Sequence, residues 1–474
     1  MGLYGLMPRM GQPDPVVTPE GWLHRGDCYV RGDGVQLAIF GGIPGERARV
    51  RLVGGSNRQE RARWVAAAGR PHPDRVSPPC DRFAPCGRCP LMHLRPAAQD
   101  VVRQQMVEQA FAEAGLPPRC EPPIRGGDAD VQHTLSLITG FSDQRHPRLG
   151  VPGHDGREVV PIPGCTLATP SLREVMKVVA HHVRDLEIWP WDGRQGTLRA
   201  VYAREAPDGE VSVLFVAARP NNHLAELAAR ITSAHPPIAG VLLHRNEEPG
   251  PALTRGDDGS VGVSLLYGKP TLTLPVGSLR LKVGWTSPFP DHVVLHQRLQ
   301  TDLVALLAPE PGDASVDIGP GDGALAMLLA QAGGWALGIV PHEAQALFAR
   351  DNAAANTIPA EFASGEVPYV LEDTAERLSG RRPLFVVDVG TRGLKDDGLA
   401  AIIGLAPRRV VLRGTNPRSL ARNVAAFTAR GWELRRVLTY DVSPHTPFVE
   451  IVAVLHSADR TAPERRAPRR RTVR

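Results

Sequence analysis

The second half of this 474-residue chain contains no cysteine, because all six cysteines lie before residue 166. No apolar run approaches the ~20 residues that a membrane-spanning helix needs. The opening segment MGLYGLMPRM lacks the continuous apolar stretch of a signal peptide, and Leu6 stands where a myristoylation site needs Ser or Thr. These absences predict a cytoplasmic protein without a membrane attachment.

Charge is concentrated at the C-terminal end of the chain. Residues 457–474 contain seven Arg against Asp459 and Glu464, which equals the formal net charge of +5 of the whole chain. A Pro-interrupted run of Arg cannot form a core, so we expect a disordered tail that attracts phosphates without reading a sequence. A tail that only improves solubility is the alternative.

The first part of the chain has the pattern of a small β-barrel. Residues 1–19 are predicted to be an unstructured lead-in, and residues 20–69 alternate apolar and polar side chains around several glycines. Such alternation with frequent turns is typical of short antiparallel strands that close into a barrel. A generic barrel without a ligand would give the same pattern.

The middle of the chain, residues 70–285, is predicted to form an α+β domain. A helix is expected over about 97–114, where apolar residues recur at helical spacing, and it is expected to pack on the neighbouring cysteines. Strand-like runs (VSVLFVAA, GVLLHR, LRLKVG) and a helix over 222–234 follow. With 42% apolar residues, the whole chain can bury two to four such domains.

From residue 286 to residue 456 strands and helices alternate. The expected strands are SVDI (315–318), ALGIV (336–340), LFVVDV (384–389) and RVVLR (409–413), and LRRVLTYDV and FVEIVAVL close the domain. This alternation predicts a doubly wound, Rossmann-like α/β sheet, which binds ligands at the carboxyl ends of its strands.

Four of the cysteines have a spacing typical of a metal site. Cys80, Cys86 and Cys89 are separated by five and two residues, and Cys165 follows far downstream. Four thiolates can hold zinc or a [4Fe–4S] cluster, and the spacing does not decide between these metals. A disulfide pair is the alternative, against which a cytosolic location argues.

A glycine-rich turn marks the expected cofactor pocket. Asp317 ends a strand, and Gly319, Gly321 and Gly323 follow before a helix, so the backbone can approach a nucleotide-like ligand. No phosphate-binding Lys is nearby, which favours S-adenosylmethionine over ATP. The motif Asn352-Ala353-x-x-Asn356 after the second strand supports this interpretation.

Together these motifs resemble the RNA uracil-5-methyltransferase family, from Gly21 to Leu455 and in the family's order. Gly34-Val35 and Ile43-Pro44-Gly45-Glu46 are similar to its OB-like TRAM domain. The text C-x5-C-G-x-C-P-x-x-H with the IPGC segment at 162–165 resembles its iron–sulfur signature. The resemblance implies a [4Fe–4S] cluster in preference to zinc, S-adenosylmethionine as cofactor, and a structured rRNA or tRNA as partner of a monomeric enzyme.

The resemblance also assigns the cofactor and base positions. Asp373 and Asp388 match cofactor-binding positions, and Glu450, in the segment PHTPFVE, falls on the general base. The family's acidic ribose ligand is replaced by Val340, with Glu343 three residues later, and its Phe-Phe-Gln segment reads Pro288-Phe289-Pro290. We therefore expect cofactor binding to be weakened.

The nucleophile is the main departure from the family. There, a cysteine thiolate adds to C6 of uracil, C5 takes the methyl group, and a base removes the C5 proton before the thiolate leaves. The family's Ser-Cys-Asn-Pro reads Gly414-Thr415-Asn416-Pro417 here, and its Asp-Pro-Pro-Arg is reduced to Asp388-Val389-Gly390-Thr391. Two hypotheses follow: a divergent methyltransferase, or an inactive RNA-binding member of the family.

Overall fold

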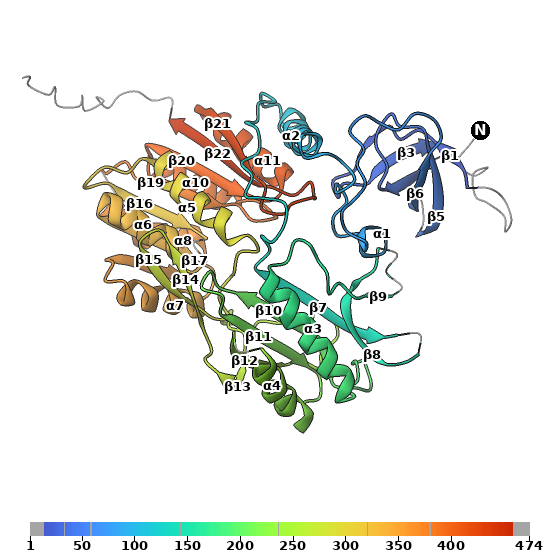
Figure 1. Cartoon of the computed structure of the whole chain (residues 1–474). Coiled ribbons are helices and arrows are strands. Elements are labelled where there is room, and N and C mark those ends of the chain that lie inside the picture. Colours follow the sequence, from blue (N-terminus) through green and yellow to red (C-terminus); the bar gives the residue numbers. More distant parts are fainter. Residues whose placement is uncertain are drawn as a thin grey trace, which may run out of the picture.

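The computed structural model describes residues 14–457 apart from 33, 57–58, 143, 155, 157, 236, 320 and 379–380. It shows three sheet-based units in chain order (Figure 1). Most of the predicted lead-in and the Arg-rich tail lie outside the described residues, so both stay predictions. No helix in the described part of the chain is long and apolar enough to cross a membrane.

The first unit is a strongly curved six-stranded sheet with the order β1-β5-β6-β4-β3-β2. Its strands are β1 (Val16–Val17), β2 (Gly21–Trp22), β3 (Cys28–Gly32), β4 (Val35–Phe40), β5 (Ala48–Ser56) and β6 (Gln59–Ala67). Alternate side chains such as Leu37, Ile39 and Val50 face one small core, as the sequence pattern predicted. Because β1 pairs with β5, the unit starts before residue 20, and the predicted boundary is wrong by a few residues.

Two helices follow the barrel, α1 (Phe83–Cys86) and α2 (Pro96–Glu113). The predicted helix over 97–114 is confirmed, but it packs on the third unit as well as on the cysteine segment. Its first half contacts the cysteine segment, where Val102 packs on Leu91 and Leu94. Its second half belongs to the third unit, because Val107 and Phe111 lie in that unit's core and α2 packs on α11 (Pro417–Thr428).

The central unit is a seven-stranded sheet with the order β13-β12-β11-β10-β7-β8-β9. Two helices, α3 (Pro170–Asp185) and α4 (Asn222–Ala234), cover one of its faces (Figure 1). The predicted helix over 222–234 is confirmed. The strands are β7 (Thr134–Phe141), β8 (Pro147–Pro152), β9 (Val159–Val160), β10 (Leu198–Glu205), β11 (Val211–Ala217), β12 (Ile238–Arg245) and β13 (Ser264–Gly268).

The third unit is a doubly wound sheet with the order β18-β17-β16-β19-β20-β22-β21. Its strands are β16 (Ala314–Ile318), β17 (Trp335–Val340), β18 (Ala360–Ser364), β19 (Leu384–Asp388), β20 (Arg409–Gly414), β21 (Trp432–Tyr440) and β22 (Glu450–Ser457). The predicted strands are confirmed, and β18 was missed because only Phe362 of its five residues is buried. In this order the first five strands, from β18 through β20, are parallel to one another. β22 is antiparallel to β20, and β21 is antiparallel to β22.

Helices cover both faces of this third sheet (Figure 1). Besides α11 they are α5 (Val293–Leu307), α6 (Ala324–Gly333), α7 (Glu343–Ala355), α8 (Val367–Asp373), α9 (Ala375–Leu378) and α10 (Asp396–Gly404). The chain runs outward from β16 to β18 and then returns to β19 on the other side of β16. This reversal places a ligand-binding crevice at the carboxyl ends of β16 and β19.

The hairpin of β14 (Leu272–Val276) and β15 (Leu279–Val283) belongs to the third unit. Its apolar side chains share a core with α6 and α7. Asn352 on α7 accepts from the backbone N of Lys282 at 2.8 Å and donates to its carbonyl at 3.1 Å, and Asn356 makes the same pair with Arg280. The predicted boundary at residue 285 is therefore wrong, and these asparagines hold the hairpin instead of marking the cofactor pocket.

Candidate functional site

Two connected cavities lie where the three units meet. The larger, which we call the reaction cavity, has a volume of about 1090 Å³ and is lined by Glu450, Thr415, Arg413 and residues of β2, β3 and α2. The smaller, the cysteine cavity, has about 480 Å³. Asp291, His292, Val442, Ser443 and Phe448 line both cavities. A ligand as long as a short RNA strand could therefore contact both cavities at once.

The reaction cavity combines aromatic and basic side chains from the barrel with the end of the third sheet. Trp22, Tyr29 and Arg31 line it from the barrel, and Arg31 lies 4.6 Å from the ring centre of Tyr29. Phe448 is 45% exposed on the wall between the two cavities. Exposed aromatic rings with nearby guanidinium groups suit unpaired nucleobases, because a base can stack on the ring while Arg contacts its phosphate.

The floor of the reaction cavity carries a partly buried ion cluster. Arg413, near the end of β20, donates to Asp388 Oδ2 through Nη2 at 3.0 Å and through Nε at 3.4 Å. The same Nε lies 3.6 Å from Glu450 Oε1, at the start of β22. β19 and β20 run parallel and end at the same edge of the sheet, where the antiparallel β22 begins, and this brings the three residues to one point. Sequence reasoning found Asp388 and Glu450 but missed Arg413, although a charge inside the apolar run VVLR was a signal.

Burial raises the pKa of Glu450 to about 7, against the opposing effect of Arg413. Its Oε1 has no hydrogen-bond partner in the described part of the chain. A carboxyl group with a pKa near neutrality can accept a proton at physiological pH and return it to solvent. These properties suit the general-base role that the resemblance implies for Glu450, and that role stays a prediction.

Thr415 lies on the wall of the reaction cavity in the turn between β20 and α11. The turn is ordered by Asn416, which caps α11 by accepting from the backbone N of Arg418 at 3.1 Å. Its amide donates to the carbonyl of Thr391 at 3.0 Å, which ties the Asp388–Thr391 turn to the same place. Thr415 itself is exposed. The lining of the reaction cavity contains no cysteine in the described part of the chain.

The glycine-rich turn has the backbone geometry that the sequence predicted. Gly319, Gly321 and Gly323 all have positive φ, of 84°, 64° and 88°, which favours glycine. A Cβ on Gly319 would lie 3.0 Å from Cβ of Asp388, so the turn lies directly against the ion cluster. Burial raises the pKa of Asp317 to about 7, and its Oδ2 has no hydrogen-bond partner among the described residues.

Several residues of the expected cofactor site make other contacts or lie away from the glycine-rich turn. Glu343 pairs with Arg350 at 2.7 Å and accepts from Ser364, so it is not a free ribose ligand. Pro288 fills the space beside Gly321, where a Cβ would meet its Cγ at 2.9 Å. Asp373 is the exposed last residue of α8, and no interaction joins it to the described residues of the glycine-rich turn. Asp317 and Asp388 are the acidic residues that the fold brings to this turn.

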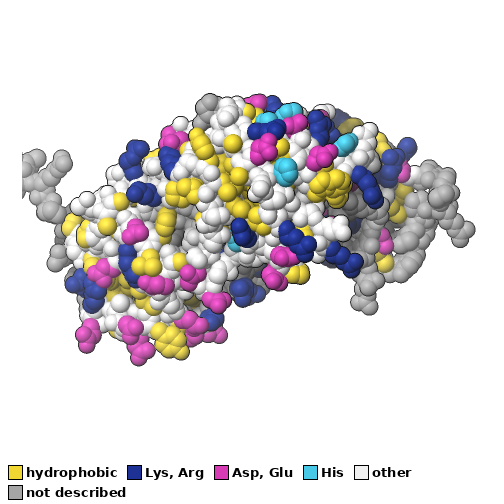
Figure 2. All heavy atoms as spheres, turned by 90° about the horizontal axis from the view of Figure 1, so that it is seen from below, with side chains coloured by type: hydrophobic (Ala, Val, Ile, Leu, Met, Phe, Trp, Pro, Cys, Tyr) yellow, Lys and Arg dark blue, Asp and Glu magenta, His cyan; other side chains and the backbone are white. Residues whose placement is uncertain are grey.

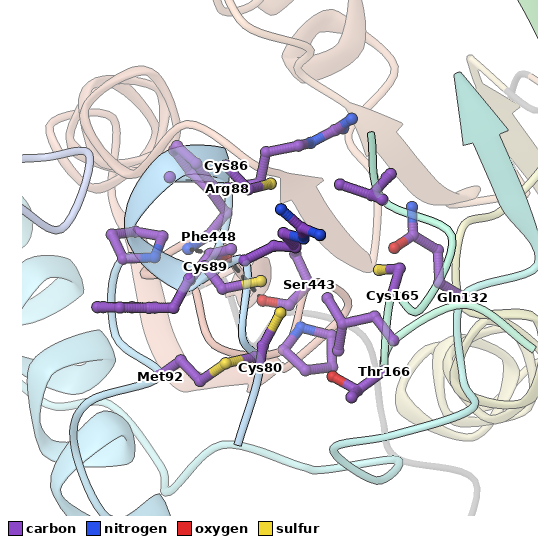
Figure 3. Close-up of a pocket in the computed structure, with 18 of the residues that line it drawn as sticks. Cys80, Cys86, Arg88, Cys89, Met92, Gln132, Cys165, Thr166, Ser443 and Phe448 are labelled. Carbon is purple, nitrogen blue, oxygen red and sulfur yellow. Dashed lines mark hydrogen bonds between the residues drawn. The ribbon is translucent and has the colours of Figure 1, made fainter. Parts of the chain in front are cut away.

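The four predicted cysteine ligands line one cavity. In Figure 3 the sulfur atoms of Cys80, Cys86 and Cys89 point into a space that Cys165 faces from the opposite side. Burial raises the pKa of Cys89, and the nearby Cys165, Cys86 and Cys80 raise it further. Among the described residues, however, no three His, Cys, Asp or Glu side chains are grouped closely enough to hold a metal ion.

The segment between Ser443 and Glu450 connects the two cavities. His445 has a φ of 62°, and its carbonyl accepts from the backbone N of Leu91, two residues after Cys89, at 2.8 Å. From α2, Gln99 bonds to Nδ1 of His445 at 3.2 Å, and Arg103 donates to the carbonyl of Thr446 at 3.0 Å. The cysteine segment therefore holds in place the turn that precedes Glu450.

Comparisons with known proteins extend over most of the chain. A 23S rRNA (uracil(1939)-C(5))-methyltransferase from a Shewanella species is 25% identical over 448 residues, covering 92% of this chain and 94% of the relative. An uncharacterized RNA methyltransferase from Streptomyces coelicolor is 27% identical over 454 residues, with 92% and 91% coverage. The crystal structure of a tRNA (uracil-54, C5)-methyltransferase from Pyrococcus abyssi with S-adenosyl-L-homocysteine has a TM-score of 0.72 at 19% identity, covering 93% of this chain and all of that chain. No protein-family model matches.

Proposed function

We propose that this chain is an RNA methyltransferase with a divergent reaction centre. The premise is its homology to RNA uracil-C5-methyltransferases over about nine-tenths of its length. Its substrate is a structured rRNA or tRNA that enters the reaction cavity as an unpaired strand. The observation that carries this proposal is the single cavity shared by Glu450, Thr415 and the aromatic and basic residues of the barrel. The protein acts as a cytoplasmic monomer.

The residues around the glycine-rich turn fit S-adenosylmethionine by charge. Asp317 has an unpartnered buried carboxylate oxygen, and the three glycines have the positive φ of a tight turn beside it. Asp317, Asp388 and the backbone of Gly319, Gly321 and Gly323 would hold the cofactor, which supplies an electrophilic methyl group when bound. Pro288 fills the space beside Gly321, and Glu343 is paired with Arg350, so neither offers the cofactor a polar contact. We therefore expect weak binding.

In the reaction cavity Glu450 holds and releases the proton, and Arg413 keeps its carboxylate oriented. Thr415 occupies the position of the family's thiol, but a hydroxyl ionises far less readily and needs an adjacent base. No interaction joins Thr415 to a basic group in the described part of the chain. We therefore propose that methyl transfer proceeds without an enzyme adduct at C6, or does not occur at uracil C5.

We also propose that Cys80, Cys86, Cys89 and Cys165 hold a [4Fe–4S] cluster. All four line one cavity of about 480 Å³, and four cysteine thiolates are the ligand set of such a cluster. Arg25, Arg61, Arg82 and Arg88 line the same cavity and would offset the negative charge of a thiolate-ligated cluster. Because this segment holds the His445 turn, the cluster's role is structural.

A second candidate function is RNA binding without methylation, and Thr415 favours it. An inactive homologue would keep the barrel, the cysteine segment and the reaction cavity while losing the nucleophile. Figure 2 shows one face of the molecule, on which acidic side chains gather toward the end formed by the third unit and Lys and Arg are spread over the rest. Both candidates use the barrel side of the cavity for RNA.

Calorimetric titration with S-adenosylmethionine separates the two candidates. A methyltransferase binds it and, with tritiated cofactor, labels a structured rRNA or tRNA. An RNA-binding homologue binds the RNA alone. Asp317→Asn is the matched variant, since it should abolish cofactor binding and leave RNA binding unchanged. If the protein binds neither the cofactor nor RNA, both candidates are wrong.

A further inference from the structure

Arg413 is a partly buried cation that lies among carboxyl groups at one edge of the third sheet. It contacts Asp388 at 3.0 Å and Glu450 at 3.6 Å. Asp317 and Asp322 lie close enough for Arg413 to favour their ionised forms. The carboxylates in turn raise the pKa of Arg413 although burial opposes its charge. Arg413 therefore opposes the effect of burial and favours the ionised forms of these carboxyl groups.

Among the described residues around this cluster, the other basic groups are neutral or exposed. His296 on α5 lies in the same region, but burial, followed by the nearby Arg413, lowers its pKa to about 4, so the ring is neutral at pH 7. Arg31 and Arg418 also line the reaction cavity, and both are exposed. Asp317 is 3% exposed with an unpartnered Oδ2, and Oε1 of Glu450 has no hydrogen-bond partner either. Two carboxyl oxygens of the cluster thus lack a hydrogen-bond partner among the described residues, and a bound cation would favour the ionised forms of these groups.

S-adenosylmethionine brings a sulfonium cation, and S-adenosylhomocysteine has the same groups with a neutral thioether. A cluster of carboxylates distinguishes the two molecules by attracting the sulfonium charge. A cation that already lies among the carboxylates weakens that attraction. The distinction applies to this chain because the glycine-rich turn lies against Asp388, the residue that Arg413 binds most closely.

We propose that Arg413 is a resident counter-cation of the cofactor pocket, which lowers its preference for S-adenosylmethionine over S-adenosylhomocysteine. The inference rests on the proposed function, because it requires that the pocket binds this class of cofactor. It assigns to Arg413 a specificity role: the guanidinium keeps the carboxylates neutralised when no cofactor is bound and competes with the cofactor's own charge.

The test measures the dissociation constants of both molecules by calorimetry for the unmodified protein and for Arg413→Met. We expect the ratio of the S-adenosylhomocysteine constant to the S-adenosylmethionine constant to rise about tenfold in the variant, since one buried charge at a few ångströms changes the interaction by at least that much. Arg413→Lys keeps the charge and should keep the original ratio. Arg409→Met is the matched control on the same strand, because Arg409 binds the carbonyls of Leu306 and Leu307 at its other end.

If Arg413→Met fails to fold, the double variant Arg413→Met/Glu450→Gln replaces it, because removing Glu450 as well leaves one fewer uncompensated carboxylate beside the lost guanidinium. Its ratio should also rise, since Asp317 and Asp388 lose their cation. An unchanged ratio in the variants that bind both molecules would overturn the inference and leave the proposed function intact. If the unmodified protein binds neither molecule, the proposed methyltransferase function fails, and the inference fails with it.

Discussion

Glu450→Gln should change how the stability of the protein depends on pH. The pKa of Glu450 rises from an ordinary 4.5 to about 7 in the folded protein, chiefly through burial. Between these values the unfolded chain releases the proton while the folded protein keeps it. Glu450 therefore stabilises the fold below pH 4.5, and this contribution is lost as the pH rises toward 7.

The size of the effect follows from the shift. One pKa unit corresponds to about 1.4 kcal/mol, so a shift of this size is worth about 3 kcal/mol. The difference in unfolding free energy between unmodified protein and Glu450→Gln should fall by about that amount between pH 4 and pH 8. Asp317 and Asp322 contribute to the pH dependence of both proteins, so the comparison isolates Glu450.

The assay is urea unfolding followed by tryptophan fluorescence at pH 4, 5, 6, 7 and 8. Glu433→Gln is the control, because Glu433 is an exposed carboxylate at the far end of the neighbouring strand β21, and its curve should run parallel to that of the unmodified protein. Parallel curves for Glu450→Gln and the unmodified protein would refute the reasoning. They would mean that Glu450 is solvated or fully neutralised by Arg413.

Four further outcomes are expected. Protein purified without oxygen should be brown, with broad absorption near ~400 nm, and Cys86→Ser should bleach it and lower its melting temperature. Colourless protein with stoichiometric zinc would show that the metal is zinc and not iron. The unmodified protein should form no denaturation-resistant adduct with 5-fluorouracil-containing RNA, whereas Thr415→Cys should form one; an adduct mapped to Thr415 would show that the hydroxyl is a nucleophile after all. Deletion of residues 458–474 should weaken RNA affinity and flatten its salt dependence, and an unchanged salt slope in filter binding would restrict the tail to solubility. Asn352→Ala should lower the unfolding free energy by about 1–3 kcal/mol through the two lost hydrogen bonds to Lys282, and a change below ~0.5 kcal/mol would show that the hairpin needs no clamp.

The local sequence determined the order of the elements and the positions where the backbone requires a particular residue. The strands of the third sheet were predictable because each is a short apolar run between helical segments, and strands with such patterns are buried on both faces. Gly319, Gly321 and Gly323 were predictable for a similar reason, since each has a backbone conformation that disfavours other residues. The sequence also predicted that Cys165 joins the three earlier cysteines in one metal site; all four line one cavity, and the metal site itself stays a prediction.

Only the tertiary structure decided how the polar side chains pair. The sequence pattern of Asn352 and Asn356 was compatible with a cofactor site, but packing placed them against the edge of β15. In the sequence, Arg413 only follows an apolar run at the end of a strand. Its partners Asp388 and Glu450 come from two other strands. Sheet order alone makes these three residues neighbours. Charges that are distant in sequence acquire their energies from burial and from one another, so the chemistry of this centre depended on the assembled sheet.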